Sequence, residues 1–168
     1  RKLIGAQSNF LSGKFLDLES FDHKDSYYLG YLLNARRRLD QPIEFKSAEY
    51  SYINYGTVVY GKTALVFDYL MAYLGNDVMD NAMHAYFDTW KFKHPQPEDL
   101  RKILEEETGK DLSWFFDNLI NGVALIDYKI VKAKNTGSEY TVTVRNVTNT
   151  NVPFSISGIV GGKSTNTT

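Results

Sequence analysis

The chain has 168 residues, of which 43% are hydrophobic and 23% charged, and this ordinary composition excludes a wholly disordered protein. Lysine and arginine number 19 against 20 aspartates and glutamates, so a net charge of −1 argues against a nucleic-acid partner. No apolar run approaches the roughly 18 residues of a membrane-spanning segment. Cysteine is absent, which excludes disulfides and thiol chemistry and is compatible with an extracytoplasmic location.

Helical periodicity dominates the first 122 residues, although residues 1–20 show no clear pattern. Apolar side chains recur at helical spacing in five segments, and residues 43–56 between the first two indicate an irregular, tyrosine-rich loop. Glycines follow two of these segments and a proline opens another, as is typical of helix ends and starts. We expect helices over residues 24–39, 57–74, 78–90, 97–108 and 112–120. The helix over 57–74 is apolar nearly all round, so we expect it to be buried on most sides.

Alternating apolar and polar residues replace this pattern after residue 122. They predict strands over residues 126–130, 140–145 and 152–156, with a turn at 135–138. Three strands are too few to close a sandwich, which needs about seven. The predicted fold class is therefore mainly α, resembling a helical bundle, with a short C-terminal antiparallel β segment that we interpret as a truncated β-sandwich. The predicted boundary separates a helical part, 1–122, from the start of a β-sandwich, 123–168.

The sequence offers no local metal-binding motif. The three histidines, His23, His84 and His94, have no second histidine three or four residues away. The zinc-protease signature H-E-x-x-H is absent, and so is the G-x-S-x-G signature of serine hydrolases. We therefore predict no metal ligand and no cofactor site within this chain.

One string does match a nucleotide-binding pattern. Residues 56–63 read G-T-V-V-Y-G-K-T, which has the spacing of a P-loop with Lys62 as its lysine. A P-loop follows an apolar parallel strand, whereas the preceding residues, 51–55, are polar and aromatic. No alternation of strands and helices surrounds the string, so nucleotide binding remains only as a rival hypothesis.

Two segments together resemble one enzyme family. Residues 55–64, followed by an apolar helix that ends at Leu74 and Gly75, resemble the segment after the zinc site in aminopeptidase N-type zinc metallopeptidases, which are gluzincins. In that family a tyrosine precedes x-Lys-Gly and an apolar helix. Residues 108–117 resemble the later G-x-D-L-x-x-F-F helix of the same family. The order and separation of the two motifs fit, and the resemblance covers roughly residues 45–160.

The resemblance implies a role for two tyrosines. Tyr60 would be the catalytic tyrosine, whose phenol donates a hydrogen bond to the oxyanion of the tetrahedral intermediate. Tyr55 matches a second active-site tyrosine of some members. The parent protein would be a zinc aminopeptidase that hydrolyses the N-terminal bond of a peptide substrate.

The family's zinc ligands and general base should precede Tyr60, and their motifs are not in this sequence. We therefore expect the chain to be a fragment of the catalytic domain, inactive alone, with zinc held by the parent protein. The alternative is a non-catalytic helical module that binds a protein or peptide through its aromatic surface, since the chain has 12 tyrosines and 10 phenylalanines. Peptide preference and oligomeric state are left open.

Overall fold

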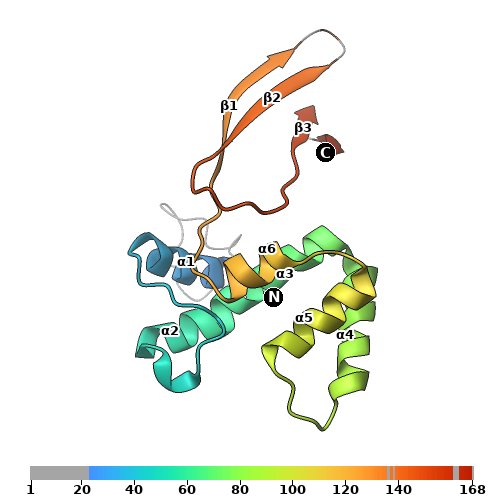
Figure 1. Ribbon diagram of the computed structural model, residues 1–168. Coiled ribbons are helices and arrows are strands. Elements are labelled where there is room, and N and C mark those ends of the chain that lie inside the picture. Colours follow the sequence, from blue (N-terminus) through green and yellow to red (C-terminus); the bar gives the residue numbers. More distant parts are fainter. Residues whose placement is uncertain (1–22, 136, 138, 161–162, 168) are drawn as a thin grey trace, which may run out of the picture.

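A computed structural model describes residues 23–135, 137, 139–160 and 163–167. Helices make up the larger part and two hairpins of β-strands follow at one end of it (Figure 1). This arrangement confirms the predicted mainly α class with a C-terminal antiparallel β segment. Residues 1–20 lie outside the described part. Among the described helices, none has the length and apolarity to cross a bilayer.

The described residues form six α-helices, one 3₁₀-helical turn and two π-helical turns. The α-helices are α1 (His23–Arg36), α2 (Tyr52–Gly56), α3 (Thr63–Leu74), α4 (Asn76–Trp90), α5 (Pro97–Thr108) and α6 (Ser113–Phe115). A 3₁₀ turn, η1 (Ser47–Glu49), precedes α2, and two π-helical turns, η2 (Thr57–Lys62) and η3 (Phe116–Ile120), follow α2 and α6. Gly75 and Gly109 end α3 and α5 with φ of 87° and 62°. Positive φ values favour glycine, so these two glycines end the helices where the sequence predicted.

The tyrosine-rich segment is more regular than predicted. The loop expected over 43–56 contains η1 and α2, and α2 continues through η2 into α3 without a break. Ser51 begins this helix, because its hydroxyl accepts a hydrogen bond from the Asn54 backbone N–H at 3.3 Å. Such N-caps satisfy a backbone donor that the first helical turn leaves unpaired. The helix predicted from residue 57 therefore begins five residues earlier.

The first helix ends earlier than predicted. The expected helix over 24–39 stops at Arg36, and Arg38 adopts a φ of 56°. The Arg38 and Leu39 backbone N–H groups then donate to Ala35 and Asn34 at 3.0 Å each. This left-handed turn satisfies the last carbonyls of α1, so the helix closes before it reaches Pro42.

The core lies where α3, α4, α5 and the last helical turns meet, and it contains the apolar positions that the helical periodicity indicated. Phe115 stands at its centre, with its ring 5.4 Å from that of Phe67 and 5.0 Å from that of Phe116. Its buried members are Leu70, Leu74, Met79, Ala82, Leu104, Leu112, Phe115, Phe116, Leu119 and Ile120. The segment 57–74, expected to be buried on most sides, is buried or half-buried along most of its length, and its exposed residues are Tyr60, Ala64, Ala72 and Tyr73.

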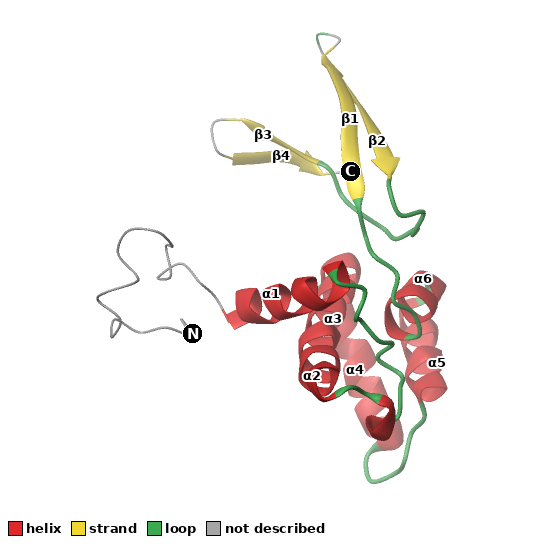
Figure 2. Ribbon diagram, turned by 90° about the vertical axis from the view of Figure 1, so that its left-hand side faces the viewer, coloured by secondary structure: helices red, strands yellow, loops and turns green. Residues whose placement is uncertain are grey.

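The strands form two separate two-stranded antiparallel sheets (Figure 2). One pairs β1 (Tyr128–Asn135) with β2 (Tyr140–Asn146), with an irregular register between Ile130 and Lys132. The other pairs β3 (Ser157–Val160) with β4 (Lys163–Thr167). The strand predicted over 140–145 matches β2 to within one residue, whereas the strand predicted over 126–130 shares only residues 128–130 with β1, which begins two residues later and ends at Asn135.

The third predicted strand, 152–156, is wrong, because these residues form a loop. The Val152 N–H donates to the Tyr128 hydroxyl at 3.1 Å, and this hydroxyl lies 3.1 Å from the Val152 carbonyl. The Tyr69 hydroxyl donates to the Pro153 carbonyl. Side chains thus occupy the backbone groups that a neighbouring strand would need, and Pro153 has no N–H to offer.

Candidate active-site tyrosines and their anchors

Tyr55 and Tyr60 lie next to each other on one exposed face. Tyr55 is in α2 and Tyr60 in η2, and their ring centroids are 6.2 Å apart with an interplanar angle of 72°. Tyr50 stands edge-on to Tyr55 at 6.3 Å, and Phe45 lies 6.0 Å from Tyr50. These four rings form an aromatic row. Edge-to-face contacts of this kind are favourable because the positive rim of one ring meets the negative face of the next.

The wide turn of η2 explains why residues five apart come together. In an α-helix, side chains at positions i and i+5 diverge, whereas a π-helix bonds residue i+5 back to residue i. The Thr63 N–H donates to the Val58 carbonyl, and its hydroxyl donates to the same carbonyl at 3.2 Å. Such π-helical turns occur frequently at functional sites. The sequence string around Tyr60 thus forms a widened helical turn.

Tyr60 and Tyr55 face outward. Tyr60 is 60% exposed and Tyr55 is 44% exposed. Their phenols are therefore accessible to a ligand or to another polypeptide segment. In the same turn Val58, Gly61 and Lys62 are buried, so the helix turns Tyr60 away from the core.

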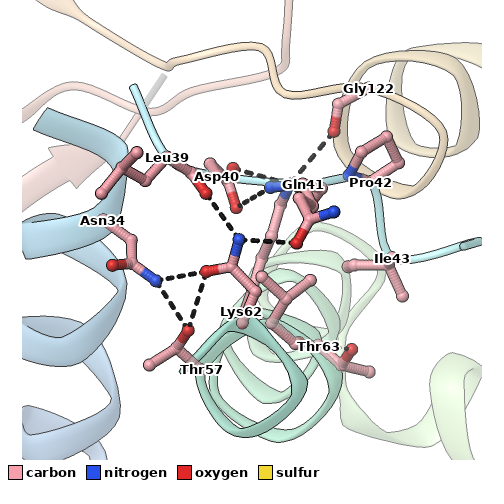
Figure 3. A network of polar contacts seen from close by, with 12 residues as sticks. Asn34, Leu39, Asp40, Gln41, Pro42, Ile43, Thr57, Lys62, Thr63 and Gly122 are labelled. Carbon is pink, nitrogen blue, oxygen red and sulfur yellow. Dashed lines mark hydrogen bonds and ion pairs between the residues drawn. The ribbon is translucent and has the colours of Figure 1, made fainter. Parts of the chain in front are cut away.

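Lys62 is the buried anchor of this turn. Only 1% of it is exposed, and its Nζ lies 2.8 Å from the Asp40 carboxylate (Figure 3). The same Nζ donates to the Gln41 carbonyl at 3.1 Å and to the Gly122 carbonyl at 3.0 Å. A lysine ammonium has three N–H donors, and here each finds an acceptor. Lys62 thereby joins the turn after α1, the turn of Tyr60 and the end of the last helical segment.

A second polar cluster fixes the other end of the turn. The Asn34 amide of α1 donates to Asn54 in α2 and, at 2.8 Å, to the Thr57 hydroxyl (Figure 3). The Asn54 amide donates in turn to the Leu39 carbonyl and, at 2.8 Å, to the Gln41 side chain. Asn34 and Asn54 are both buried. A buried amide is costly unless it is hydrogen-bonded, so this cluster specifies how α1 and α2 meet.

The structure argues against the nucleotide-binding hypothesis. A P-loop lysine extends from a glycine-rich loop toward phosphates. Residues 57–62 are instead helical, and Lys62 is buried with its three donors paired. Its ammonium is not available to a phosphate in this arrangement.

The described residues do not fit a metal ion. In the part of the chain that the structure covers, no three histidine, aspartate or glutamate side chains converge as a metal site would require. His84 and His94 are exposed on separate segments.

Several residues of this site were not predicted from the sequence. Lys62 was considered only as a P-loop lysine, and no role in a site was predicted for Asp40. A signal was nevertheless present, because a lysine within an apolar helical run has to be paired or exposed. Nothing in the sequence indicated the contact between Asn34 and Asn54, which are 20 residues apart.

Comparison with known proteins identifies the family. The model of the peptidase family M1 domain matches residues 25–119, which is more than half of the chain, and the chain belongs to this family. Aminopeptidase N of Streptomyces lividans is 35% identical over 60 residues, which cover 36% of this chain and 7% of that protein. No solved structure matches significantly. The resemblance to aminopeptidase N-type metallopeptidases is thus confirmed.

Proposed function

We propose that the chain is part of a zinc-dependent aminopeptidase, in which Tyr60 stabilises the oxyanion formed during hydrolysis of an N-terminal peptide bond. The observation that carries the proposal is the position of Tyr60: a phenol exposed on a widened turn that two buried polar anchors hold. Family membership supports an aminopeptidase-like parent. The zinc would polarise the substrate carbonyl and activate water. Its ligands would come from residues outside those described.

Tyr60 would act as a hydrogen-bond donor. When water attacks the scissile carbonyl, negative charge gathers on the carbonyl oxygen, and a phenol O–H placed about 3 Å away donates to it. Such a donor accelerates the reaction most when it is held in place beforehand, because no free energy is then spent on orienting it. The paired Lys62 and the contact with Tyr55 supply this orientation. Tyr55 would support the ring of Tyr60 and extend the surface that faces the peptide.

We also propose that residues 1–122 belong to the catalytic domain and residues 123–168 to a following β-sandwich domain. The chain alone is then expected to lack aminopeptidase activity, because it would have a phenol donor but no zinc ligands. Zinc-dependent turnover of an aminoacyl substrate by the pure 168-residue chain would contradict this.

The test is a kinetic comparison of Tyr60→Phe in the full-length parent protein. Removing one oxyanion donor costs about 10²–10³ in kcat, whereas KM should change little because the donor acts in the transition state. Tyr52→Phe is the matched control, since Tyr52 is almost fully exposed in the same helix but lies outside the aromatic row. An unchanged kcat in Tyr60→Phe would remove the proposed role.

A second candidate function is peptide binding without catalysis. The exposed aromatic row favours it, because tyrosines are enriched at interfaces. This alternative predicts that Tyr60→Phe retains full peptide affinity and that the parent protein has no turnover to lose. A measurable wild-type kcat with zinc would exclude it.

A further inference from the structure

Lys62 and Tyr60 are neighbours on one turn but face opposite ways. Residues two apart on a helix point toward roughly opposite sides of its axis, and this holds for the widened turn as well. Lys62 is accordingly buried while Tyr60 is exposed. A constraint on the direction of Lys62 therefore fixes the rotation of the turn about its axis, and with it the direction of Tyr60.

The constraint on Lys62 is unusually complete. Its ammonium contacts three acceptors on two segments that are remote in sequence: Asp40, 22 residues away, and Gly122, 60 residues away, besides the Gln41 carbonyl. All three N–H donors of the ammonium are thus paired, one with a carboxylate and two with carbonyls. The π-helical turn, by contrast, is intrinsically less favourable than an α-helical one and needs tertiary contacts to persist.

We propose that Lys62 is a positioning residue for Tyr60: the buried contacts of its ammonium with Asp40, Gln41 and Gly122 hold the widened turn in the rotation that presents the Tyr60 phenol. The proposal rests on the proposed function only for its kinetic consequence. Its structural part concerns the orientation of a ring and holds whether or not the parent protein is an enzyme.

The first test measures the orientation of Tyr60 in the 168-residue chain by NMR. The Tyr60 ring signals are assigned by their loss in Tyr60→Phe. The wild type is expected to show a nuclear Overhauser contact between the rings of Tyr55 and Tyr60, which lie 6.2 Å apart between centroids. Lys62→Met is expected to shift the Tyr60 signals and weaken this contact.

Two further variants separate positioning from loss of folding. Lys62→Met leaves Asp40 as an unpaired buried charge, so the double variant Lys62→Met/Asp40→Asn is made as a neutral pair that folds more readily. It lacks the ammonium and is expected to show the same displaced Tyr60. Leu104→Ala removes a fully buried side chain from α5, away from the turn, and is expected to leave the Tyr60 signals unchanged. Wild-type Tyr60 signals in the folded double variant would overturn the proposal.

The second test is a double-mutant cycle on kcat in the full-length parent protein. If Lys62 acts through Tyr60, Lys62→Met lowers kcat by about 10²-fold in the wild-type background, the scale of a donor displaced by about 1 Å. The same substitution is expected to lower kcat hardly further in the Tyr60→Phe background. Equal losses in both backgrounds would mean that Lys62 has only a general structural role.

The two tests distinguish a failure of the proposed function of Tyr60 from a failure of the positioning role of Lys62. If Tyr60→Phe has wild-type kcat, the proposed function of Tyr60 is wrong, and the NMR comparison still decides whether Lys62 orients the ring. If the Tyr60 ring stays in place without the ammonium, the positioning role is wrong, and the kinetics of Tyr60→Phe then decide the role of Tyr60 in turnover independently.

Discussion

The ammonium of Lys62 lies 2.8 Å from the carboxylate of Asp40, with side-chain exposures of 2% and 4%. This ion pair connects the turn after α1 to the turn that carries Tyr60. Removing two charges from water is costly, and the gain from their attraction offsets that cost only where further hydrogen bonds complete the site. The carbonyls of Gln41 and Gly122 provide those bonds.

Breaking this pair should strongly destabilise the fold. Lys62→Met leaves the Asp40 carboxylate buried without its partner, and we expect the free energy of unfolding to fall by about 3–5 kcal/mol. Lys102→Met is the control, because Lys102 is exposed and its ammonium lies as far as 3.9 Å from Glu106. This substitution should change the free energy of unfolding by less than about 0.5 kcal/mol. Denaturant midpoints of the two variants make the comparison. Similar midpoints would contradict a buried anchor.

Gly122 should not tolerate a side chain. A Cβ at this position would lie 2.7 Å from the Asn118 carbonyl oxygen, so the backbone has to move and take the Gly122 carbonyl away from Lys62. We expect Gly122→Ala to cost about 1–3 kcal/mol, the usual range for overpacking. Thermal unfolding of the variant measures this cost.

Gly56→Ala is the matched control for Gly122→Ala. Apart from its chain neighbours and the backbone of its own helix, no atom lies within 4 Å of the added Cβ, and the backbone of Gly56 is already helical. Alanine should therefore stabilise the fold by about 0.4–1 kcal/mol, chiefly by restricting the unfolded chain. Gly122→Ala should therefore lower the free energy of unfolding and Gly56→Ala should raise it. A loss of stability in both variants would contradict the local geometry described for Gly56.

Tyr31 should lose its phenolic proton at a higher pH than an exposed tyrosine does. Burial raises its pKa from 10.0 to about 12, and the negative charge of Asp40 adds to this shift. The folded state therefore keeps the phenol protonated to a higher pH than the unfolded state does. Its contribution to stability is complete below pH 10 and is lost as the pH rises from 10 toward about 12.

Asp40→Asn tests the charge contribution, because it removes the negative charge that adds to the shift and should lower the pKa of Tyr31. Since it also leaves the Lys62 ammonium buried without its carboxylate, the variant is first shown to be folded by its NMR spectrum. NMR titration of ¹³C-labelled tyrosine rings follows the group directly. Asp77→Asn, an exposed carboxylate in the first turn of α4, serves as the control and should leave Tyr31 unchanged. Titration of Tyr31 near pH 10 in the wild type would contradict the described burial.

Local sequence signals predicted the parts of the fold that local physics determines. Gly75, Pro97 and Gly109 mark helix ends whose observed bounds follow the prediction closely. The core positions followed from helical periodicity, since burial of one apolar stripe needs only the spacing of residues. Strands β1 and β2 were recognised by alternation in the same way.

Long-range contacts explain what the sequence did not reveal. The widened turn at Tyr60 depends on Lys62 meeting Asp40 and Gly122, and no local pattern encodes a contact across 60 residues. The strand predicted over 152–156 failed because Tyr128 and Tyr69 bind its backbone from elsewhere in the chain. The candidate tyrosines came from a family resemblance, whereas their anchors came only from the structure.

The role of Tyr60 as oxyanion donor is tested most directly by the structure of the proposed full-length parent protein with a transition-state analogue of peptide hydrolysis bound. The Tyr60 hydroxyl is expected to lie about 2.7–3.1 Å from the analogue oxygen that represents the oxyanion. In that complex Lys62 is expected to keep its contacts with Asp40, Gln41 and Gly122. A Tyr60 phenol directed away from the analogue, with another residue donating to that oxygen, would contradict this role of Tyr60.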